Sequence, residues 1–292
     1  MAHKAGFVNI IGAPNAGKST LMNLLMGQEL AIVTPKAQTT RHRIRGIING
    51  EDHQIVLSDT PGIMEPAYKL HEKMLDSVNQ VFADSDIILL VTEISKRKIM
   101  DDVAKKLKAA EIPVFVLVNK IDISNQNDLE AEVEYWNKKL QPTEVIPISA
   151  LENFNIDTVV KKIISHLPES PAYFDKETLT DRNVRFFIAE IIREQIFLNY
   201  DKEIPYNSEV SIDRFKEEEK ITKIGAYIFV ERDSQKGIIL GHQGKAIKRT
   251  GTNARIKMEE FLGKKVFLEL HVKVRGDWRN SEDQLKRFGY GQ

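Results

Sequence analysis

The chain has 292 residues, which is enough for two domains that each bury a core, and its 42% hydrophobic and 29% charged residues are ordinary for a globular protein. It has no cysteine, which excludes disulfides and thiolate metal sites and fits a reducing compartment. The N-terminus has no long apolar run, so we expect no secretory signal, and apolar runs such as residues 87–91 are far too short to span a bilayer.

The formal net charge of +0 hides an uneven distribution. Residues 1–180 hold 20 Lys and Arg against 24 Asp and Glu, a net of −4, whereas residues 181–292 hold 22 against 18, a net of +4. Within that second part, residues 236–292 hold 13 against 6, a net of +7. A basic C-terminal region indicates contact with a polyanion, and the alternative is an ordinary solvated surface.

The first part of the chain alternates short, nearly continuous apolar runs with amphipathic stretches. Such alternation predicts an α/β domain with a doubly wound, mostly parallel sheet whose strands are buried on both faces. The segment at 41–50 is expected to pair antiparallel with 53–59. The expected strands are 6–12, 41–50, 53–60, 86–93, 113–120 and 143–150, and the expected helices are 18–27, 66–83, 100–111, 127–140 and 153–166.

The second part follows a segment at 169–182 that contains Pro171 and little periodicity, and this segment predicts a linker. Thr180 or Asp181 is expected to cap a helix over 183–199. We therefore expect a nucleotide-binding domain over 1–168 and a smaller α+β domain over 183–292. After the first helix, that domain is predicted to run strand, strand, helix, helix, strand, over 209–219, 222–232, 237–240, 245–263 and 265–275.

Residues 12–19, GAPNAGKS, fit the pattern G-x-x-x-x-G-K-S between a strand and a helix, which is the context of a phosphate-binding loop. Its backbone amides and the helix N-terminus face an anion. Lys18 is expected to reach the β- and γ-phosphates, and Ser19 to offer its hydroxyl to Mg²⁺. The residues predicted to contact the nucleotide here are Gly12, Ala13, Pro14, Asn15, Ala16, Gly17, Lys18, Ser19 and Thr20.

The sequence DTPG at 59–62 comes at the end of a predicted buried strand. Asp59 is placed there to hold the Mg²⁺ shell, and the amide of Gly62 to approach the γ-phosphate. Thr60 and Pro61 complete this predicted contact segment.

The sequence NKID at 119–122 selects the base. The Asp122 carboxylate can accept from both N1–H and the exocyclic amine of guanine, whereas adenine would leave it unpaired. Lys120 is expected to cover the base, and Asn119 to tie the base to the phosphate loop. The next strand end supplies further contacts near the guanine O6, from Ser149, Ala150 and Leu151.

Together these motifs resemble the GTPases of the translation-factor-related class, over about residues 5–167. The resemblance implies binding of GTP and GDP, hydrolysis of GTP, and a switch between two states. Such GTPases need a threonine that closes over Mg²⁺ and the γ-phosphate, for which Thr39 and Thr40 are candidates, and the TTR pattern favours Thr40. The metal set is then Ser19, Thr40 and Asp59, and the catalytic set is Asn15, Lys18, Thr40 and Gly62.

Ile63 follows the DTPG motif, and an apolar side chain cannot orient water by hydrogen bonding. In GTPases that resemble this chain and carry an asparagine at position 15, a K⁺ ion sits beside the phosphates. The hypothesis is that Asn15 holds K⁺, with Thr34, Thr39 and the backbone near Lys36 completing its shell, while the switch backbone places the water. The alternative is that Asn15 only braces the loop.

The C-terminal part contains G-x-x-G at 241–244, between two predicted helices. That element order resembles a KH domain of the second topology, in which the loop clamps about four nucleotides of RNA. Ile238, Ile239 and Ile247 are expected to line the groove for bases, and Lys257 is expected to add a phosphate contact together with Arg255 and Arg275. The predicted RNA contacts are Gly241, Gly244, Lys245, Ile247, Lys248, Arg249, Arg255 and Arg275, and the alternative is an α/β module without RNA.

Over essentially its whole length, the chain resembles the bacterial Era family, on the segments KAQTTRHRI (36–44), DTPGI, NKID, GHQGKAIKRTGTNAR and DWR (277–279). The resemblance implies a cytoplasmic ribosome-assembly GTPase that binds the 3′ end of small-subunit ribosomal RNA and no DNA. It also implies weak association with the inner face of the membrane. His242 and Gln243 depart from the loop usual there and lower its charge.

Three other functions remain open from the sequence. They are a GTPase of tRNA modification, an RNA-binding protein with a vestigial nucleotide site, and a membrane-surface regulator. The KH-like region argues against the first, and intact Lys18, Ser19, Asp59 and Asp122 argue against the second. No strongly amphipathic basic helix favours the third.

Overall fold

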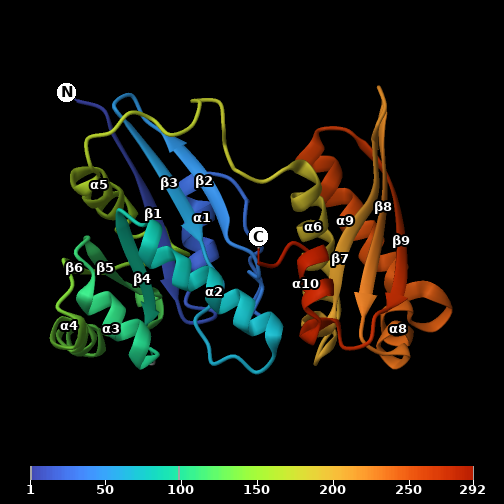
Figure 1. Cartoon of the computed structure of the whole chain (residues 1–292), viewed down its shortest axis with the longest axis horizontal. Coiled ribbons are helices and arrows are strands. Elements are labelled where there is room, and N and C mark those ends of the chain that lie inside the picture. The colour runs from blue at the N-terminus through green and yellow to red at the C-terminus, as the bar shows by residue number, and fades with distance from the viewer. Residues whose placement is uncertain (1, 98, 292) are drawn as a thin grey trace. The chain divides into compact units, whose positions relative to one another are not determined.

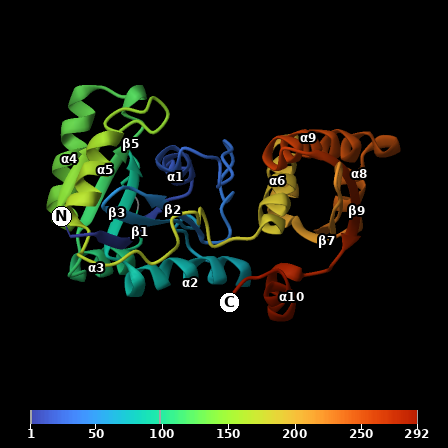
Figure 2. The ribbon, with the colours of Figure 1, turned by 90° about the horizontal axis from the view of Figure 1, so that it is seen from above.

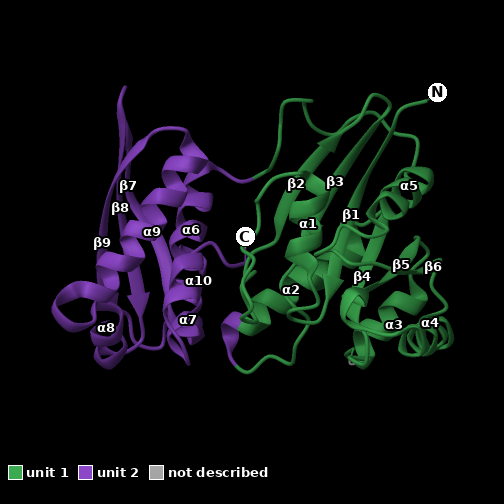
Figure 3. Ribbon diagram, turned by 180° about the vertical axis from the view of Figure 1, so that it is seen from behind, with its two compact units in different colours: residues 1–67, 71–181 green, residues 68–70, 182–292 purple. Residues whose placement is uncertain are grey.

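The computed structural model describes residues 2–97 and 99–291. Within them, the chain divides into two compact units, one of the residues up to 67 with those from 71 to 181, and the other of residues 68–70 with those from 182 onward (Figure 3). No helix in the described part is long and apolar enough to cross a membrane.

The first unit is built on a six-stranded sheet with the order β2-β3-β1-β4-β5-β6 (Figure 1). Only the β2–β3 pair is antiparallel, as the sequence predicts, and the other pairs are parallel. The strands β4 and β5 are buried along their whole length, which explains their continuous apolar sequences. The strands are β1 Lys4–Gly12, β2 Ile44–Asn49, β3 His53–Asp59, β4 Ile87–Glu93, β5 Val114–Asn119 and β6 Glu144–Pro147.

Helices cover both faces of this sheet. On one face, apolar residues of α2, α3 and α4 share a core with β4 and β5. Helix α1 lies on the other face of β1 and β3 from α2 (Figure 2). The helices are α1 Lys18–Met26, α2 Lys69–Asp84, α3 Asp101–Ala109, α4 Gln126–Leu140 and α5 Ile156–His166, with a short 3₁₀ turn, η1, at Ile121–Ile123.

The connection that follows β1 lies at the point where the strand order reverses. Strand β1 pairs with β3 on one side and with β4 on the other, so the chain turns in opposite directions from it. In open α/β sheets, ligands bind beside such a reversal at the carboxyl ends of the strands. The loop at 12–18 and the strand ends at Asp59, Glu93 and Asn119 meet at this edge.

The segment 169–182 has no helix or strand, but it is not a free tether. Thr180 donates from its hydroxyl to the Arg45 carbonyl, and Gln54 bonds to the backbone of Phe174. The expected caps, Thr180 and Asp181, are therefore wrong, because both contact β2. Helix α6 Val184–Asn199 is capped instead by Asn183, whose side chain accepts from the Phe186 amide over 3.0 Å.

A second difference lies between β6 and α5. The helix expected over 153–166 begins only at Ile156. Ser149 and Phe154 pair through both of their backbone amides, and Asn155 has a φ of 62°, so the chain closes a loop before the helix starts. This loop holds residues 149–151 at the sheet edge.

The second unit has a three-stranded sheet, β7-β8-β9, with a core between one sheet face and the helices α6, α8 and α9 (Figure 2). Strands β7 and β8 are antiparallel, and β8 and β9 are parallel. This arrangement confirms the fold expected for this part of the chain. Its further elements are α7 Ile204–Asn207, β7 Glu209–Glu217, β8 Ile221–Val230, α8 Asp233–Leu240, η2 His242–Gly244, α9 Lys245–Leu262, β9 Lys265–Val274, η3 Trp278–Asn280 and α10 Glu282–Arg287.

The sequence did not predict the elements after residue 275. Trp278 is fully buried and donates from its indole nitrogen to the Asn207 carbonyl, and Leu285 is also fully buried. Tyr290 donates to the Glu209 carboxylate over 2.5 Å. The C-terminal segment is therefore an integral part of the second unit.

Candidate functional site

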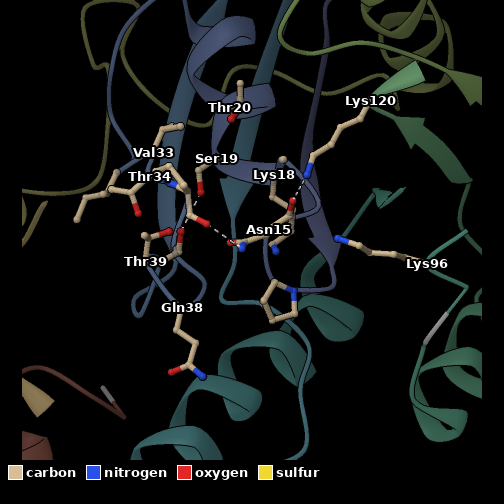
Figure 4. Close-up of a pocket in the computed structure, with 16 residues that line it drawn as sticks. Asn15, Lys18, Ser19, Thr20, Val33, Thr34, Gln38, Thr39, Lys96 and Lys120 are labelled. Atoms are coloured by element: carbon tan, nitrogen blue, oxygen red, sulfur yellow. Dashed lines mark hydrogen bonds between the residues drawn. The ribbon is translucent and has the colours of Figure 1, made fainter. Parts of the chain in front are cut away.

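A cavity of about 390 Å³ opens between the loop after β1 and residues 32–40 (Figure 4). Ten of its lining side chains are labelled in the figure, among them Lys18, Ser19, Thr39 and Lys120. Its lining comprises Pro14, Asn15, Gly17, Lys18, Ser19, Thr20, Ile32, Val33, Thr34, Pro35, Gln38, Thr39, Thr40, Gly62, Lys96 and Lys120.

The loop is shaped by a close contact at Gly17. Gly17 has a φ of 96°, and a Cβ there would lie 2.2 Å from the Asn119 side-chain nitrogen. Only glycine fits such a position without strain. The Asn119 nitrogen in turn donates to the Ala16 carbonyl over 2.8 Å, so the loop is fastened to the end of β5.

The three predicted metal ligands lie together: Ser19 and Thr40 line this cavity, and Asp59 is fully buried in contact with both. The Ser19 hydroxyl lies 2.6 Å from Asp59 Oδ2 and 2.9 Å from the Thr40 hydroxyl, which lies 3.0 Å from the same carboxylate oxygen. Thr40 is buried, whereas Thr39 is half-buried. The geometry therefore groups Thr40, rather than Thr39, with Ser19 and Asp59.

Asp59 and Lys18 are charged side chains buried at this point. Burial raises the pKa of Asp59, although Lys18 and the hydroxyls of Ser19 and Thr40 oppose the shift. Burial lowers the pKa of Lys18 to about 8, against the attraction of Asp59 and Glu93. Both shifts mark groups that have lost water without gaining full compensation.

One further observation tests whether a metal ion fits here. Asp59 Oδ1 is buried and has no hydrogen-bond partner among the described residues. An unpaired carboxylate oxygen beside two hydroxyls is a hard oxygen donor set that suits Mg²⁺. Ser19, Thr40 and Asp59 therefore fit this ion, with bound phosphates supplying the remaining oxygens.

The guanine motif is held by hydrogen bonds between the strand ends. Asn119 accepts from the Ala150 amide over 2.9 Å, and Ser149 donates from its hydroxyl to Asp122 over 2.5 Å. The cavity lining, as far as the structure describes it, reaches Lys120 but does not include Asp122 or Ser149. The Ser149 hydroxyl thus fixes the orientation of the Asp122 carboxylate, which lies two residues after the cavity-lining Lys120.

Not every predicted contact faces this cavity. The Thr60 hydroxyl donates to the Ile10 carbonyl over 2.7 Å and is buried, so it braces β1. Leu151 is 76% exposed. Gly12, Ala13 and Ala16 line a neighbouring cavity of about 410 Å³, and Pro61 lines neither cavity among the described residues.

Ile63 and Asn15 are the residues on which the predicted placement of water and K⁺ depends, and they lie on two sides of the loop at 12–18. Ile63 is buried in the core shared with α2 and α3, and its amide donates to the Gly12 carbonyl. The Asn15 side-chain nitrogen donates to the Pro35 carbonyl over 3.2 Å, and the Lys36 amide donates to the Thr34 hydroxyl. Asn15 therefore contacts the segment at 34–36, and the side chain of Ile63 offers no polar atom to water.

Sequence reasoning missed Glu93 and Lys96. The Glu93 carboxylate pairs with Lys120 Nζ at 3.0 Å and with Lys96 Nζ at 2.9 Å, while Lys120 also donates to the Asn15 carbonyl. Lys96 lines the cavity (Figure 4). The available signal was the position of Glu93 at the end of a buried strand, on the same sheet edge as Asp59.

The G-x-x-G loop of the second unit joins α8 to α9. Gly241 has φ 68° and ψ 177°, and a Cβ there would lie 2.6 Å from that of Ala246. The Tyr200 hydroxyl donates to the Ile239 carbonyl over 2.8 Å and accepts from Thr250, so α6 fixes both flanking helices. The backbone of the loop is thus held in a fixed, sharply turned shape.

The side chains predicted to surround this loop separate into two groups. Lys245 and Lys248 are exposed on α9, and Ile238 is half exposed. The prediction for Ile239 is wrong, because it is fully buried in the core. Four basic residues lie in other contacts: Arg249 donates to the Asn199 carbonyl, Arg255 pairs with Glu259, Lys257 pairs with Glu194, and Arg275 lies over the Phe229 ring.

Comparison with known proteins places these features in one family. Residues 7–120 match the model of the 50S ribosome-binding GTPase family, and residues 203–279 match that of the KH domain. The chain is 42% identical to the GTPase Era of Ruminiclostridium cellulolyticum over 99% of this chain and 98% of that protein. It is 41% identical to that of Staphylococcus haemolyticus over 99% and 97%.

Two solved structures are similar over nearly the full length. One is a variant of Era from Aquifex aeolicus bound to GDP and AlF4⁻, and the other is Era in complex with MgGDPNP and nucleotides 1506–1542 of 16S ribosomal RNA. Each has a TM-score of 0.94, is 37% identical, and covers 99% of this chain and 100% of its own. The chain with this guanine-nucleotide site and KH fold is a GTPase that belongs to the Era family.

Proposed function

We propose that this GTPase is a nucleotide-controlled RNA-binding switch that binds the 3′ end of small-subunit ribosomal RNA and assists assembly of the small ribosomal subunit. The observation that carries the proposal is the presence, in one chain, of a guanine-selective site and a preformed G-x-x-G loop followed by exposed Lys245 and Lys248. The Era complex with MgGDPNP and a 16S fragment supports this choice of RNA.

In this proposal, GTP is held by the loop at 12–19 and by Asp122 at the base. Ser19, Thr40 and Asp59 would hold Mg²⁺, which would offset phosphate charge during hydrolysis. Burial lowers the pKa of Lys18 to about 8, and bound phosphates would raise it again and so keep the ammonium charged. Thr40 and Gly62 line the same cavity, so a γ-phosphate can be sensed by both switch segments.

The RNA is proposed to lie along the G-x-x-G loop, with phosphates near Lys245 and Lys248 and bases against Ile238 and Ile247. Arg249, Arg255 and Arg275 are weaker candidates, because each has a contact elsewhere. We assign this role to a domain over 183–292, nucleotide binding to 1–168, and the connection to 169–182.

The test is the affinity for an RNA of the 3′-terminal small-subunit sequence, measured with a non-hydrolysable GTP analogue and with GDP. Coupling between two sites typically amounts to 5- to 150-fold, so we expect at least about fivefold tighter binding with the analogue. Lys245→Ala/Lys248→Ala should weaken both affinities, and Lys105→Ala/Lys108→Ala on α3 is the matched control. An equal dissociation constant with either nucleotide would contradict the switch.

We further propose that K⁺ assists hydrolysis at Asn15. The proposal rests on the apolar side chain of Ile63 and on the contact of Asn15 with Pro35, which puts the Asn15 amide beside the Pro35 carbonyl oxygen at the edge of the cavity. Single-turnover hydrolysis should be about tenfold or more faster in KCl than in NaCl. Asn15→Ala should remove that difference, and equal rates of the unaltered protein in both salts would end the idea.

A cytoplasmic location with peripheral contact on the inner membrane face is a separate proposal, motivated by the family resemblance alone. Sedimentation with anionic liposomes tests it, with neutral liposomes as the control. Protein that stays in the supernatant with both would exclude it.

A further inference from the structure

The sheet of the KH unit has a second face, turned away from the helices. On β8, Ile224, Ala226, Ile228 and Val230 point into the helical core. Since successive side chains of a strand point to opposite faces, the alternate residues point outward. The outward set is Lys223, Tyr227 and Phe229 on β8, and Lys265, Phe267, Glu269, His271 and Lys273 on β9, with Arg275 next in the alternation.

The C-terminal segment covers only one end of this face. The Phe288 ring lies 5.2 Å from that of Phe229 and 5.5 Å from that of Trp278, and Tyr290 bonds to Glu209. Helix α10 lies on this side of the sheet (Figure 2). Towards the other end, His271 is exposed and Phe267 is 47% exposed.

The uncovered part of the face, and its border with the covered end at Phe229, combine aromatic rings with cations. Tyr227 and His271 are directly opposite each other on neighbouring strands, with ring centroids 5.7 Å apart. Lys273 Nζ lies 3.4 Å from the Tyr227 centroid, and Arg275 Cζ lies 5.9 Å from that of Phe229. Neither cation has a carboxylate partner among the described residues.

The neighbouring charges on the same face are compensated. Arg214 reaches across Gly225 to pair with Glu269, so the carboxylate that lies between Phe267 and His271 is neutralised. Lys223 pairs with Glu218. On β8 and β9 the uncompensated charge is therefore positive and sits beside the Tyr227 and His271 rings.

We propose that Tyr227, His271, Lys273 and Arg275 form a second contact surface for single-stranded RNA. A base stacks on the exposed His271 ring and on the face of Tyr227 that the Lys273 side chain now covers, as Lys273 turns to a phosphate; a further phosphate lies near Arg275. Aromatic rings beside cations on an open sheet are a common platform for single strands, because every base has a stacking face. The positive charge favours a polyanion over a protein with a neutral apolar surface.

The position of β9 allows one RNA strand to reach both surfaces. Strand β9 is the edge of the sheet, and α8 and α9 pack on its other face. The helices that carry the G-x-x-G loop and the Tyr227 side thus lie on opposite faces of β9, and an RNA strand can pass from one to the other around this edge. This inference rests on the proposed RNA binding at the G-x-x-G loop and extends the RNA footprint beyond the four or so nucleotides held there.

The test uses the full chain with a non-hydrolysable GTP analogue and two labelled single-stranded RNAs from the 3′ end of small-subunit rRNA. One is about six nucleotides long, enough for the loop, and the other about twenty. We expect the unaltered chain to bind the longer RNA more tightly. His271→Ala/Lys273→Ala should weaken the longer RNA about tenfold and leave the shorter within about twofold.

Two further variants separate stacking from loss of fold. Tyr227→Phe keeps the ring and should bind the longer RNA normally, whereas Tyr227→Leu should not. Lys161→Ala/His166→Ala changes the same residue types at exposed positions of α5 and should leave both affinities unchanged. Salt dependence gives an independent check. For the longer RNA, the slope of log Kd against log salt concentration should be smaller in the His271→Ala/Lys273→Ala variant than in the unaltered chain, by about 0.7 for each phosphate contact that Lys273 makes.

Equal affinity of the unaltered chain for the two RNA lengths would overturn the inference. So would an unchanged affinity of the His271→Ala/Lys273→Ala variant for the longer RNA, which would leave the surface to a protein partner or to no partner. Absence of binding of the shorter RNA to the unaltered chain would instead contradict the proposed function itself, and the inference with it.

Discussion

Asn119 and Ala16 are 103 residues apart in the sequence, and a 2.8 Å hydrogen bond from the Asn119 side-chain nitrogen to the Ala16 carbonyl joins them. The Asn119 oxygen accepts from Ala150 over 2.9 Å, so one buried amide connects the phosphate loop, the end of β5 and the loop after β6.

Asn119→Ala should therefore loosen the whole site. Leaving the buried Ala16 carbonyl and Ala150 amide without a partner costs about 1–3 kcal/mol each, so we expect the free energy of unfolding to fall by about 2–6 kcal/mol. Urea denaturation measures this change. Asn125→Ala, which removes an exposed helix cap, should cost only about 1 kcal/mol, and an equal loss in both variants would contradict the role of Asn119.

Asp122→Asn should change the base that the protein accepts. An asparagine presents an amide donor to the exocyclic amine of guanine, whereas the carbonyl of xanthine at that place can accept from it. We expect affinity for GTP to fall by about 100-fold or more and that for xanthosine triphosphate to rise. Titration calorimetry with both nucleotides and with ATP checks the exchange, and unchanged GTP affinity would remove Asp122 from the base contact.

Thr40 and Thr39 are adjacent but should respond differently to substitution by alanine. The Thr40 hydroxyl contacts both Ser19 and Asp59, so Thr40→Ala should weaken the apparent Mg²⁺ affinity and slow hydrolysis by about 10²-fold. Thr39→Ala, its matched control, should keep the Mg²⁺ dependence. Single-turnover rates of GTP hydrolysis, measured over a Mg²⁺ titration, distinguish the two variants. A larger loss in Thr39→Ala than in Thr40→Ala would contradict the assignment of Thr40 as the metal ligand.

Nucleotide affinity should depend on pH through Lys18. Its pKa is about 8 without nucleotide, and a bound triphosphate favours the charged form and so raises that pKa. The dissociation constant should therefore stay level below about pH 8 and increase by up to about tenfold per unit above it. Fluorescent GDP titrations between pH 7 and 9.5 test this, with Lys18→Arg, whose charge persists, expected to show a flatter profile.

Trp278 should be critical for the second unit alone. It is fully buried and hydrogen-bonded to Asn207, so Trp278→Ala should cost about 3–5 kcal/mol of unfolding free energy, and Trp278→Phe clearly less. In the alanine variant Trp136 becomes the single tryptophan and reports on the first unit. In urea denaturation, the unfolding midpoint reported by Trp136 fluorescence should stay unchanged, while circular dichroism should show a second transition at lower urea concentration. If both midpoints shifted together, the two units would not unfold independently.

The motifs and the order of the elements were readable from the sequence, because they depend on contacts between residues that are near in the chain. GAPNAGKS between an apolar run and an amphipathic run predicts its strand, loop and helix, and NKID predicts guanine by the chemistry of one carboxylate. The antiparallel pairing of 41–50 with 53–59 is equally local, since a short turn joins the two strands. The predicted start of a helix was wrong where a residue distant in the sequence bonds to the expected cap. The Thr180 hydroxyl donates to the Arg45 carbonyl of β2 and so does not cap the helix.

The tertiary structure decided what depends on segments that meet from far apart. Only folding brings Thr40 onto Ser19 and Asp59, pairs Glu93 with Lys120, and buries Ile239 while Ile238 stays exposed. It also placed Arg275 on the outer face of the sheet. Alternate side chains of β9 point to opposite faces, and only the packing against the helices decides which set faces the core. The sequence by itself determined which chemistry the chain carries, because each motif is a short run with its own donors and acceptors. The tertiary structure determined which of those groups share a site, because burial and long-range hydrogen bonds exist only in the folded core.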